Sequence, residues 1–157
     1  MVIESIKRYN WQGKTALVVE EDYSGLALLK ELLGFTGMKI LDTMSGEDAV
    51  FMIKKHRKID IVLIEPAIST SDGYDAIRRI KSQRKDIPVI VQTTYTLPEE
   101  RERCFEAGCD AFVAKPIDTF ELFWNIDNFL GEDRPELNQP GRYRNQQEKT
   151  RAGRKEP

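Results

Sequence analysis

Five short apolar runs alternate with five stretches of helical periodicity along most of this chain, and this alternation restricts the fold more than any other feature. The runs are predicted to be strands over residues 15–20, 38–43, 59–64, 88–92 and 109–115. The stretches that follow them are predicted to be helices over residues 24–37, 45–58, 72–83, 96–108 and 118–131. Strictly alternating elements with apolar strands indicate an α/β fold, in which helices cover both faces of a parallel sheet.

Polar residues near the starts of these helices support their boundaries. Ser24 and Ser45 are candidate N-caps, because a side-chain oxygen there can accept a hydrogen bond from a free backbone amide. The spacing of Thr96 with Glu99, and of Asp118 with Glu121, is that of a capping box.

Length and composition favour one globular domain with a short addition at each end. The chain has 157 residues, of which 40% are hydrophobic and 32% charged. We expect an arm over residues 1–13, a domain over 14–131 and a tail over 132–157. The tail is locally basic and has almost no large apolar residues, so it is predicted to be disordered. The arm has helical spacing but is too short to be stable alone, so it either docks on the domain or pairs with another chain.

Charge and cysteine content argue against several classes of protein. The net charge of −2 gives no argument for binding to nucleic acid or membranes. No apolar run approaches the ~20 residues that span a bilayer, and no secretory signal is recognisable, so we expect a cytoplasmic protein. Cys104 and Cys109 are too few for a disulfide scaffold and are expected to be reduced thiols. His56 lies in the basic run KKHRK (54–58), which is typical of a solvated helix end.

Polar side chains follow four of the five predicted strands. In chain order they are Glu20, Glu21 and Asp22, then Glu65, then Thr93 and Thr94, then Lys115. Sites in open parallel sheets form beyond the carboxyl ends of the strands, so these side chains are expected to converge. Carboxylates, a hydroxyl and a lysine together suit phosphoryl transfer, in which acids attack phosphorus or hold Mg²⁺ and the other groups hold phosphoryl oxygens. Taken singly, Thr93 could be an ordinary strand residue and Lys115 a surface lysine.

Residues 14–131 resemble the receiver domains of two-component response regulators, which are bacterial signalling modules. The resemblance is carried by four segments: ALVVEED (16–22), DIVLIEPAISTSDGYDAIRRI (60–80), PVIVQTTYT (88–96) and EAGCDAFVAKPID (106–118). It implies a flavodoxin-like (βα)5 fold with strand order 2-1-3-4-5. The opening WQGKTALVVEED (11–22) also resembles receivers that are attached to hybrid sensor kinases.

The resemblance also implies roles for individual residues. It assigns Glu20 and Glu21 to the acidic pair of the magnesium site, Glu65 to the phosphoacceptor and metal-binding position, Thr93 to the phosphoryl-binding hydroxyl and the switch, Lys115 to the phosphoryl-binding lysine, and Phe112 to the aromatic switch. For Phe112, a place in the core and a role as a conformational switch are both open.

Glu65 departs from the family, which has an aspartate at this position. Its carboxylate lies ~1.5 Å further from the backbone, and an ~1 Å misplacement can cost ~10²-fold in rate. Mg²⁺ also demands ligands at close to ideal geometry, so a metal site built from three glutamates is in doubt. We therefore expect a receiver that acts through protein contacts without phosphorylation, and with at most residual autophosphorylation and autodephosphorylation rather than enzyme activity.

Three hypotheses for this site remain open. Glu65 could mimic the phosphorylated state by pairing with Lys115 and Thr93, or the site could be degenerate and the domain a plain binding module. Alternatively, the domain could still be phosphorylated in a Mg²⁺-dependent reaction by a histidine kinase or a phosphotransfer protein, with Asp22 as one candidate acceptor.

The last predicted helix carries more apolar surface than its core face needs. Phe120 and Trp124 form a second ridge at i, i+4 spacing. This ridge could receive the arm around Trp11 or another protein. In receivers the face that includes the last two helices is a common dimer and partner surface, so the resemblance favours a histidine kinase, a downstream target or a second copy. No nucleic acid or membrane partner is expected.

Overall fold

The structure is a computed structural model, and it describes residues 2–69 and 72–131. Its strands are β1 (Thr15–Val19), β2 (Lys39–Thr43), β3 (Ile61–Ile64), β4 (Val89–Thr93) and β5 (Ala111–Ala114). Its helices are α1 (Val2–Ile6), α2 (Tyr23–Gly34), α3 (Gly46–Lys55), α4 (Gly73–Gln83), α5 (Pro98–Ala107) and α6 (Thr119–Leu130). The predicted disordered tail, residues 132–157, lies outside the described residues.

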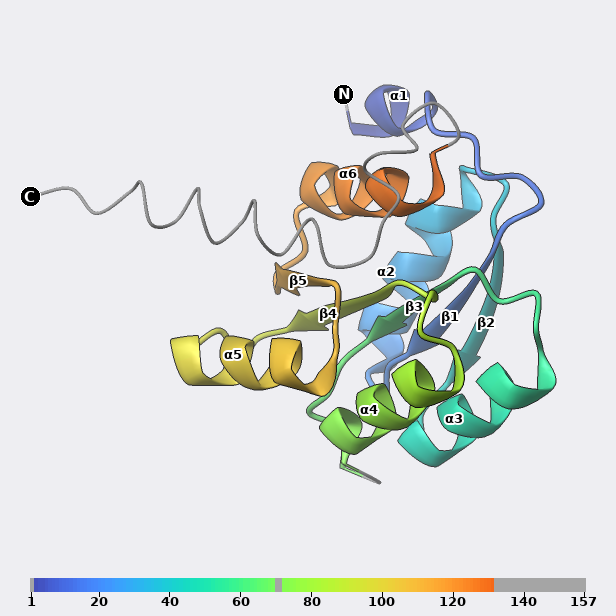
Figure 1. Ribbon diagram of the computed structural model, residues 1–157. Coiled ribbons are helices and arrows are strands. Elements are labelled where there is room, and N and C mark those ends of the chain that lie inside the picture. Colours follow the sequence, from blue (N-terminus) through green and yellow to red (C-terminus); the bar gives the residue numbers. More distant parts are fainter. Residues whose placement is uncertain (1, 70–71, 132–157) are drawn as a thin grey trace, which may run out of the picture.

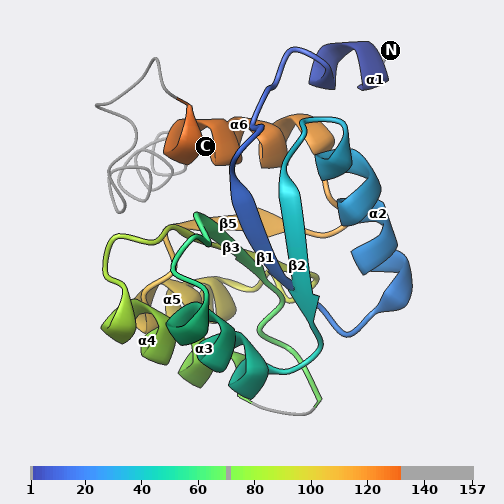
Figure 2. The same cartoon turned by 90° about the vertical axis from the view of Figure 1, so that its right-hand side faces the viewer.

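The five strands form one parallel sheet in the order β2-β1-β3-β4-β5. Helices α2 and α6 cover one face, and α3, α4 and α5 cover the other (Figures 1 and 2). Strand β3 is buried along its whole length because helices cover both of its faces, which explains its continuous apolar sequence. The α/β fold and the strand order that the sequence predicted are therefore confirmed.

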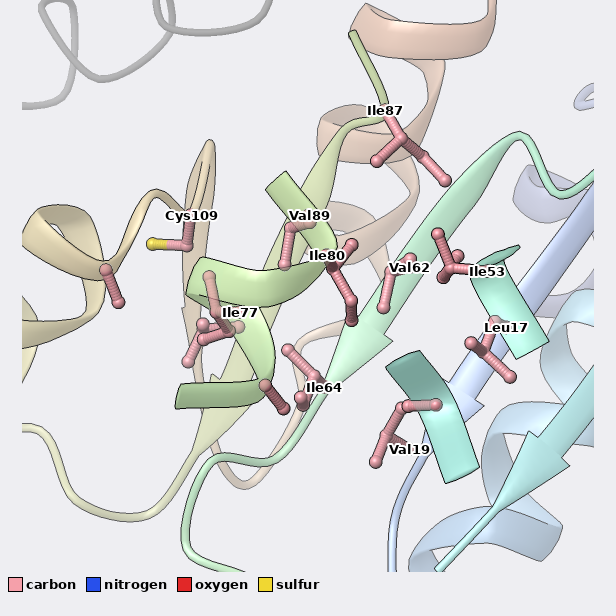
Figure 3. Packing of buried hydrophobic residues seen from close by; sticks show 14 of the residues in the cluster. Leu17, Val19, Ile53, Val62, Ile64, Ile77, Ile80, Ile87, Val89 and Cys109 are labelled. Atoms are coloured by element: carbon pink, nitrogen blue, oxygen red, sulfur yellow. The ribbon is translucent and has the colours of Figure 1, made fainter. Parts of the chain in front are cut away.

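The core is divided by the sheet into two apolar layers. In the layer under α3 and α4, Ile53, Ile77 and Ile80 pack against strand residues such as Val62 and Ile64 (Figure 3). Cys104 and Cys109 are buried in this same layer as free thiols, as predicted. Among the described residues, no helix is long and apolar enough to cross a membrane.

Two of the predicted helix caps are confirmed. Ser45 accepts a hydrogen bond from the Asp48 amide at 3.3 Å, and Asp118 accepts one from the Glu121 amide at 3.0 Å. Each bond satisfies an amide that the first turn of a helix otherwise leaves free.

The other two predicted caps are wrong. Asp22 rather than Ser24 caps α2, where its carboxylate accepts from the Gly25 amide at 2.8 Å. Helix α5 begins at Pro98 with no side-chain cap, so Thr96 lies outside it. Proline has no backbone N–H that needs a hydrogen-bond partner, and its fixed φ suits the first helical position. Pro98 therefore sets this boundary.

The arm docks on the domain, which decides between the two alternatives that the sequence left open. Ile6 is fully buried and Trp11 is 3% exposed. The Trp11 ring lies 5.2 Å from the ring of Phe123 on α6, and its Nε1 donates to Asp127 Oδ1 at 3.2 Å. Tyr9 packs edge-on against Phe123 at 5.4 Å. The arm thus adds an aromatic layer to the outer side of α6.

Candidate functional site

The carboxyl ends of β1, β3, β4 and β5 meet at one edge of the sheet. There Glu20, Glu65, Thr93 and Lys115 come together, as their positions after the strands predicted. Glu20, Glu65 and Thr93 are buried, and Lys115 is partly buried. A buried charge is costly unless it is paired, so the contacts of these groups decide what the site can do.

Lys115 supplies the positive charge of this site. Its Nζ lies 2.5 Å from Glu20 Oε2 and 3.9 Å from Glu65 Oε2. The other oxygen of Glu20, Oε1, accepts a hydrogen bond from the Asp22 amide at 3.1 Å. Both oxygens of Glu20 are therefore engaged, and Lys115 pairs more closely with Glu20 than with Glu65.

Glu65 points into the site rather than toward solvent. Glu65 is only 6% exposed, and its Oε1 accepts a hydrogen bond from Thr93 Oγ1 at 3.0 Å. No hydrogen-bond donor of the described residues reaches its Oε2.

Burial raises the pKa of Glu65 from 4.5 to about 7. The positive charge of Lys115 and the hydrogen bond from Thr93 oppose this rise, while the negative charge of Glu20 adds to it. Near neutral pH the carboxyl group is therefore close to the midpoint of its titration.

Glu21 and Asp22 make contacts of a different kind. Glu21 Oε2 accepts hydrogen bonds from the amide and the hydroxyl of Ser69, at 3.1 and 2.6 Å. These bonds lower the pKa of Glu21. Asp22 is used as the cap of α2. The two carboxylates are therefore held by Ser69 and by the Gly25 amide.

The fit of this site to Mg²⁺ can be tested on these contacts. Mg²⁺ needs oxygen ligands in near-octahedral geometry, yet Glu20 is held by Lys115 and an amide, and Glu21 by Ser69. Within residues 2–69 and 72–131, no group of three or more acidic, cysteine or histidine side chains is placed to hold a metal ion. The residues as they lie do not fit a magnesium site.

Gly73 lies against the backbone that follows Glu65. A Cβ atom added there would lie 2.3 Å from the carbonyl oxygen of Pro66 and 2.4 Å from its Cα. Asp72, just before it, caps α4 by accepting from the amides of Tyr74 and Asp75. The Asp-Gly pair of the sequence motif thus fixes where α4 begins relative to the candidate site.

We predict that Gly73→Ala lowers the free energy of unfolding by about 1–3 kcal/mol or more, because backbone atoms at such a distance must move. Urea unfolding followed by circular dichroism measures this loss. Gly34→Ala is the matched control, since no atom lies within 4 Å of the Cβ it would add. Equal stability of the two variants would contradict the close contact with Pro66.

Phe112 lies in the core layer beneath α5, where it is buried. The Arg101 guanidinium lies 5.7 Å from the centre of its ring. In this structure Phe112 fills the core, which was one of the two readings of its position.

Phe120 and Trp124 remain at the surface of α6, with exposed fractions of 48% and 41%. The arm packs on Phe123 instead, although Trp124 helps to line a cavity of about 630 Å³ between the arm and α6. Leu97, at the start of α5, is also exposed. Strand β5 is an edge strand of the sheet and lies between α5 and α6 (Figure 1). Leu97 directly precedes α5, and Phe120 and Trp124 belong to α6.

Residues 16–127 match the response regulator receiver domain family. The polar-differentiation response regulator DivK of Brucella anthropi is 26% identical over 121 residues, which cover 76% of this chain and 98% of that protein. The solved receiver domain of sensor histidine kinase PA1611 from Pseudomonas aeruginosa, with a magnesium ion coordinated in its active site cleft, is 28% identical. Its TM-score is 0.70, and the alignment covers 76% of this chain and 99% of that one.

A second solved structure is similar in the same way. The signal receiver domain of a signal transduction histidine kinase from Syntrophus aciditrophicus is 28% identical, with a TM-score of 0.68 and coverage of 74% of this chain and 89% of that one. Three findings point to the same family. They are the strand order, the convergence of polar residues at one edge of the sheet, and the family match over residues 16–127. The chain belongs to the response regulator receiver domain family of two-component signalling.

Proposed function

We propose that this receiver domain signals through protein contacts without being phosphorylated, because Glu65 stands at the phosphoacceptor position and imitates a phosphoryl group. The observation that carries the proposal is the hydrogen bond from Thr93 Oγ1 to Glu65 Oε1 at 3.0 Å, with the Lys115 ammonium 3.9 Å from the other oxygen. A hydroxyl and an ammonium are the donors that would otherwise hold phosphoryl oxygens. The imitation is partial, since a phosphate carries a charge of about −1.5 to −2.

Three features argue against phosphoryl transfer to Glu65. Its carboxylate is buried and already bonded to Thr93. Its pKa of about 7 leaves a large share of the group protonated at neutral pH, and a protonated carboxyl is a poor nucleophile. The neighbouring acids are engaged by Lys115 and Ser69 rather than arranged around a cation.

The output of such a domain would pass through its surface. The side formed by α5, β5 and α6 exposes Leu97, Phe120 and Trp124, and exposed apolar groups of this kind are typical of protein contacts. We assign to this side a histidine kinase, a downstream target or a second copy of the chain, acting in the cytoplasm.

A labelling experiment tests the proposal. The wild type, incubated with Mg²⁺ and the small phosphoryl donor acetyl phosphate, is expected to gain no phosphate by intact-mass spectrometry. A receiver that retains an aspartate acceptor, treated in parallel, verifies that the donor is active. Labelling of the wild type would instead support the alternative of a receiver that is still phosphorylated, and peptide mapping would then identify Glu65, Asp22 or another acceptor.

Two variants separate imitation from a degenerate site. Removing the carboxylate in Glu65→Ala should raise amide hydrogen exchange beyond the site, in the loop after Thr93 and in α5, because the bond that holds Thr93 is lost. Glu65→Gln keeps an acceptor for Thr93 and should change exchange less. If both variants alter exchange only at residues that touch position 65, the imitation has no consequence for the surface and the site is degenerate.

A further inference from the structure

We propose that a basic cavity between the C-terminal ends of α3 and α4 binds a small phosphorylated ligand of the pyrophosphate or nucleotide class. The cavity has a volume of about 560 Å³, and Lys54, Arg57, Arg84 and Lys85 line it together with one acid, Asp86. This volume lies within the range of about 300–1,000 Å³ that is usual for small-molecule sites.

The cavity is separate from the site around Glu65. Helices of an α/β fold run antiparallel to the strands they connect, so the ends of α3 at Lys55 and α4 at Gln83 lie at the edge where the strands begin. The two helices pack side by side on the same face of the sheet (Figures 1 and 2). Glu65 and Thr93 lie at the opposite edge, after β3 and at the end of β4.

The four positive charges of the cavity outnumber its one acid, Asp86. Within residues 2–69 and 72–131, none of its four cations forms an ion pair. Lys54, Arg57 and Lys85 are exposed, so water reduces their mutual repulsion. A bound anion would reduce it further and would use all of these charges at once.

Arg84 is the residue that points most directly to a ligand. It is half-buried, and its Nη1 is shielded from solvent with no hydrogen-bond partner in the part of the chain that the structure describes. A shielded charged donor without a partner is costly. Favourable interaction of bases with helix C-termini accounts for the exposed lysines, but it does not satisfy this nitrogen.

The chemistry of these groups indicates phosphate. A guanidinium binds phosphate oxygens through two parallel hydrogen bonds, and lysine ammonium groups add point charges beside it. Two arginines and two lysines provide enough donors for more than one phosphate group. The cations gather around one concave site, which favours a compact ligand over a nucleic acid lying across the surface.

Isothermal titration of the full chain with pyrophosphate and with ATP, at about 0.15 M salt, tests this site. The wild type should bind at least one of them, and Arg84→Gln and Arg57→Gln should each weaken binding about tenfold through the loss of charge-assisted hydrogen bonds. Lys7→Gln is the matched control, because it removes one exposed positive charge from the arm, and its affinity should equal that of the wild type.

Circular dichroism verifies that each variant is folded, and the exposed Arg57 provides a test that does not depend on the partly buried Arg84. The proposal is overturned if neither compound binds the wild type, or if Lys7→Gln weakens binding as much as the cavity variants do. It is also overturned if a single-stranded oligonucleotide binds while pyrophosphate and ATP do not, since the patch would then serve a nucleic acid.

Discussion

Replacing Trp11 with alanine is expected to lower the free energy of unfolding by about 3–5 kcal/mol, the usual cost of removing a buried tryptophan. Trp11 is 3% exposed, packs against both Tyr9 and Phe123, and donates a hydrogen bond to Asp127. Its loss removes the main contact between the arm and α6. Urea unfolding followed by far-ultraviolet circular dichroism measures the change without relying on tryptophan fluorescence.

Trp124→Ala is the matched control for this prediction. Trp124 lies on the same helix that the arm covers but is 41% exposed, so its removal should cost clearly less than that of Trp11. Trp11→Phe, which keeps a ring but not the hydrogen bond, should lie between the wild type and Trp11→Ala. Equal losses at positions 11 and 124 would show that the arm does not dock in solution.

The second large effect is the pH dependence of stability that Glu65 imposes. The pKa of Glu65 is about 7 in the folded chain, whereas the unfolded chain has the ordinary value of 4.5. The folded protein therefore binds this proton more tightly than the unfolded chain does. Its contribution to stability is fully present below about pH 4.5 and is lost as the pH rises through about 7, by about 3 kcal/mol in total.

Glu65→Gln removes this titration while keeping the shape of the side chain. The difference in unfolding free energy between the variant and the wild type should therefore shift in favour of the variant by about 2–3 kcal/mol between about pH 5 and about pH 8. Comparing the two proteins at each pH cancels the contributions of other groups, such as Asp110, whose pKa burial also raises.

Glu21→Gln provides a control that should hardly respond to pH over the same range. Ser69 lowers the pKa of Glu21, so this carboxylate contributes stability that is present above its ordinary pKa and lost as the pH falls. Its replacement should therefore cost nearly the same stability at about pH 5 and at about pH 8, and this cost should shrink only as the pH falls below about 4.5. A difference between Glu65→Gln and the wild type that does not change with pH would show that Glu65 is not buried beside Lys115 as described.

The fold could be predicted closely because its main signal is local and repeated. Each buried strand appears in the sequence as an apolar run. The order of the elements along the chain, together with the resemblance to receivers, predicts the strand order β2-β1-β3-β4-β5. Helix starts were harder, since more than one residue near each start can act as a cap. Asp22 and Ser24 are both good caps by type, and the choice depends on where the chain leaves β1.

The position of the candidate site could also be predicted, but its side-chain contacts could not. Backbone topology alone brings Glu65, Thr93 and Lys115 to one edge of the sheet, and their roles remain predictions. The sequence pattern of the strands does not predict the direction in which a side chain at a strand end turns. The sequence therefore gave no sign that Glu21 turns to Ser69, or that Lys115 lies nearer Glu20 than Glu65. The basic cavity was missed because KKHRK and the pair Arg84-Lys85 are distant in sequence and meet only where α3 packs on α4.

The position of Lys115 between two acids has a consequence for how this site stays electrically neutral. One ammonium faces Glu20 and Glu65, so the interior is one positive charge short when both acids are ionised. A proton on Glu65 supplies the missing charge. The domain can thus neutralise its second acid with a proton taken from water. The protonation of Glu65 then follows the pH of the surroundings rather than the concentration of any dissolved metal.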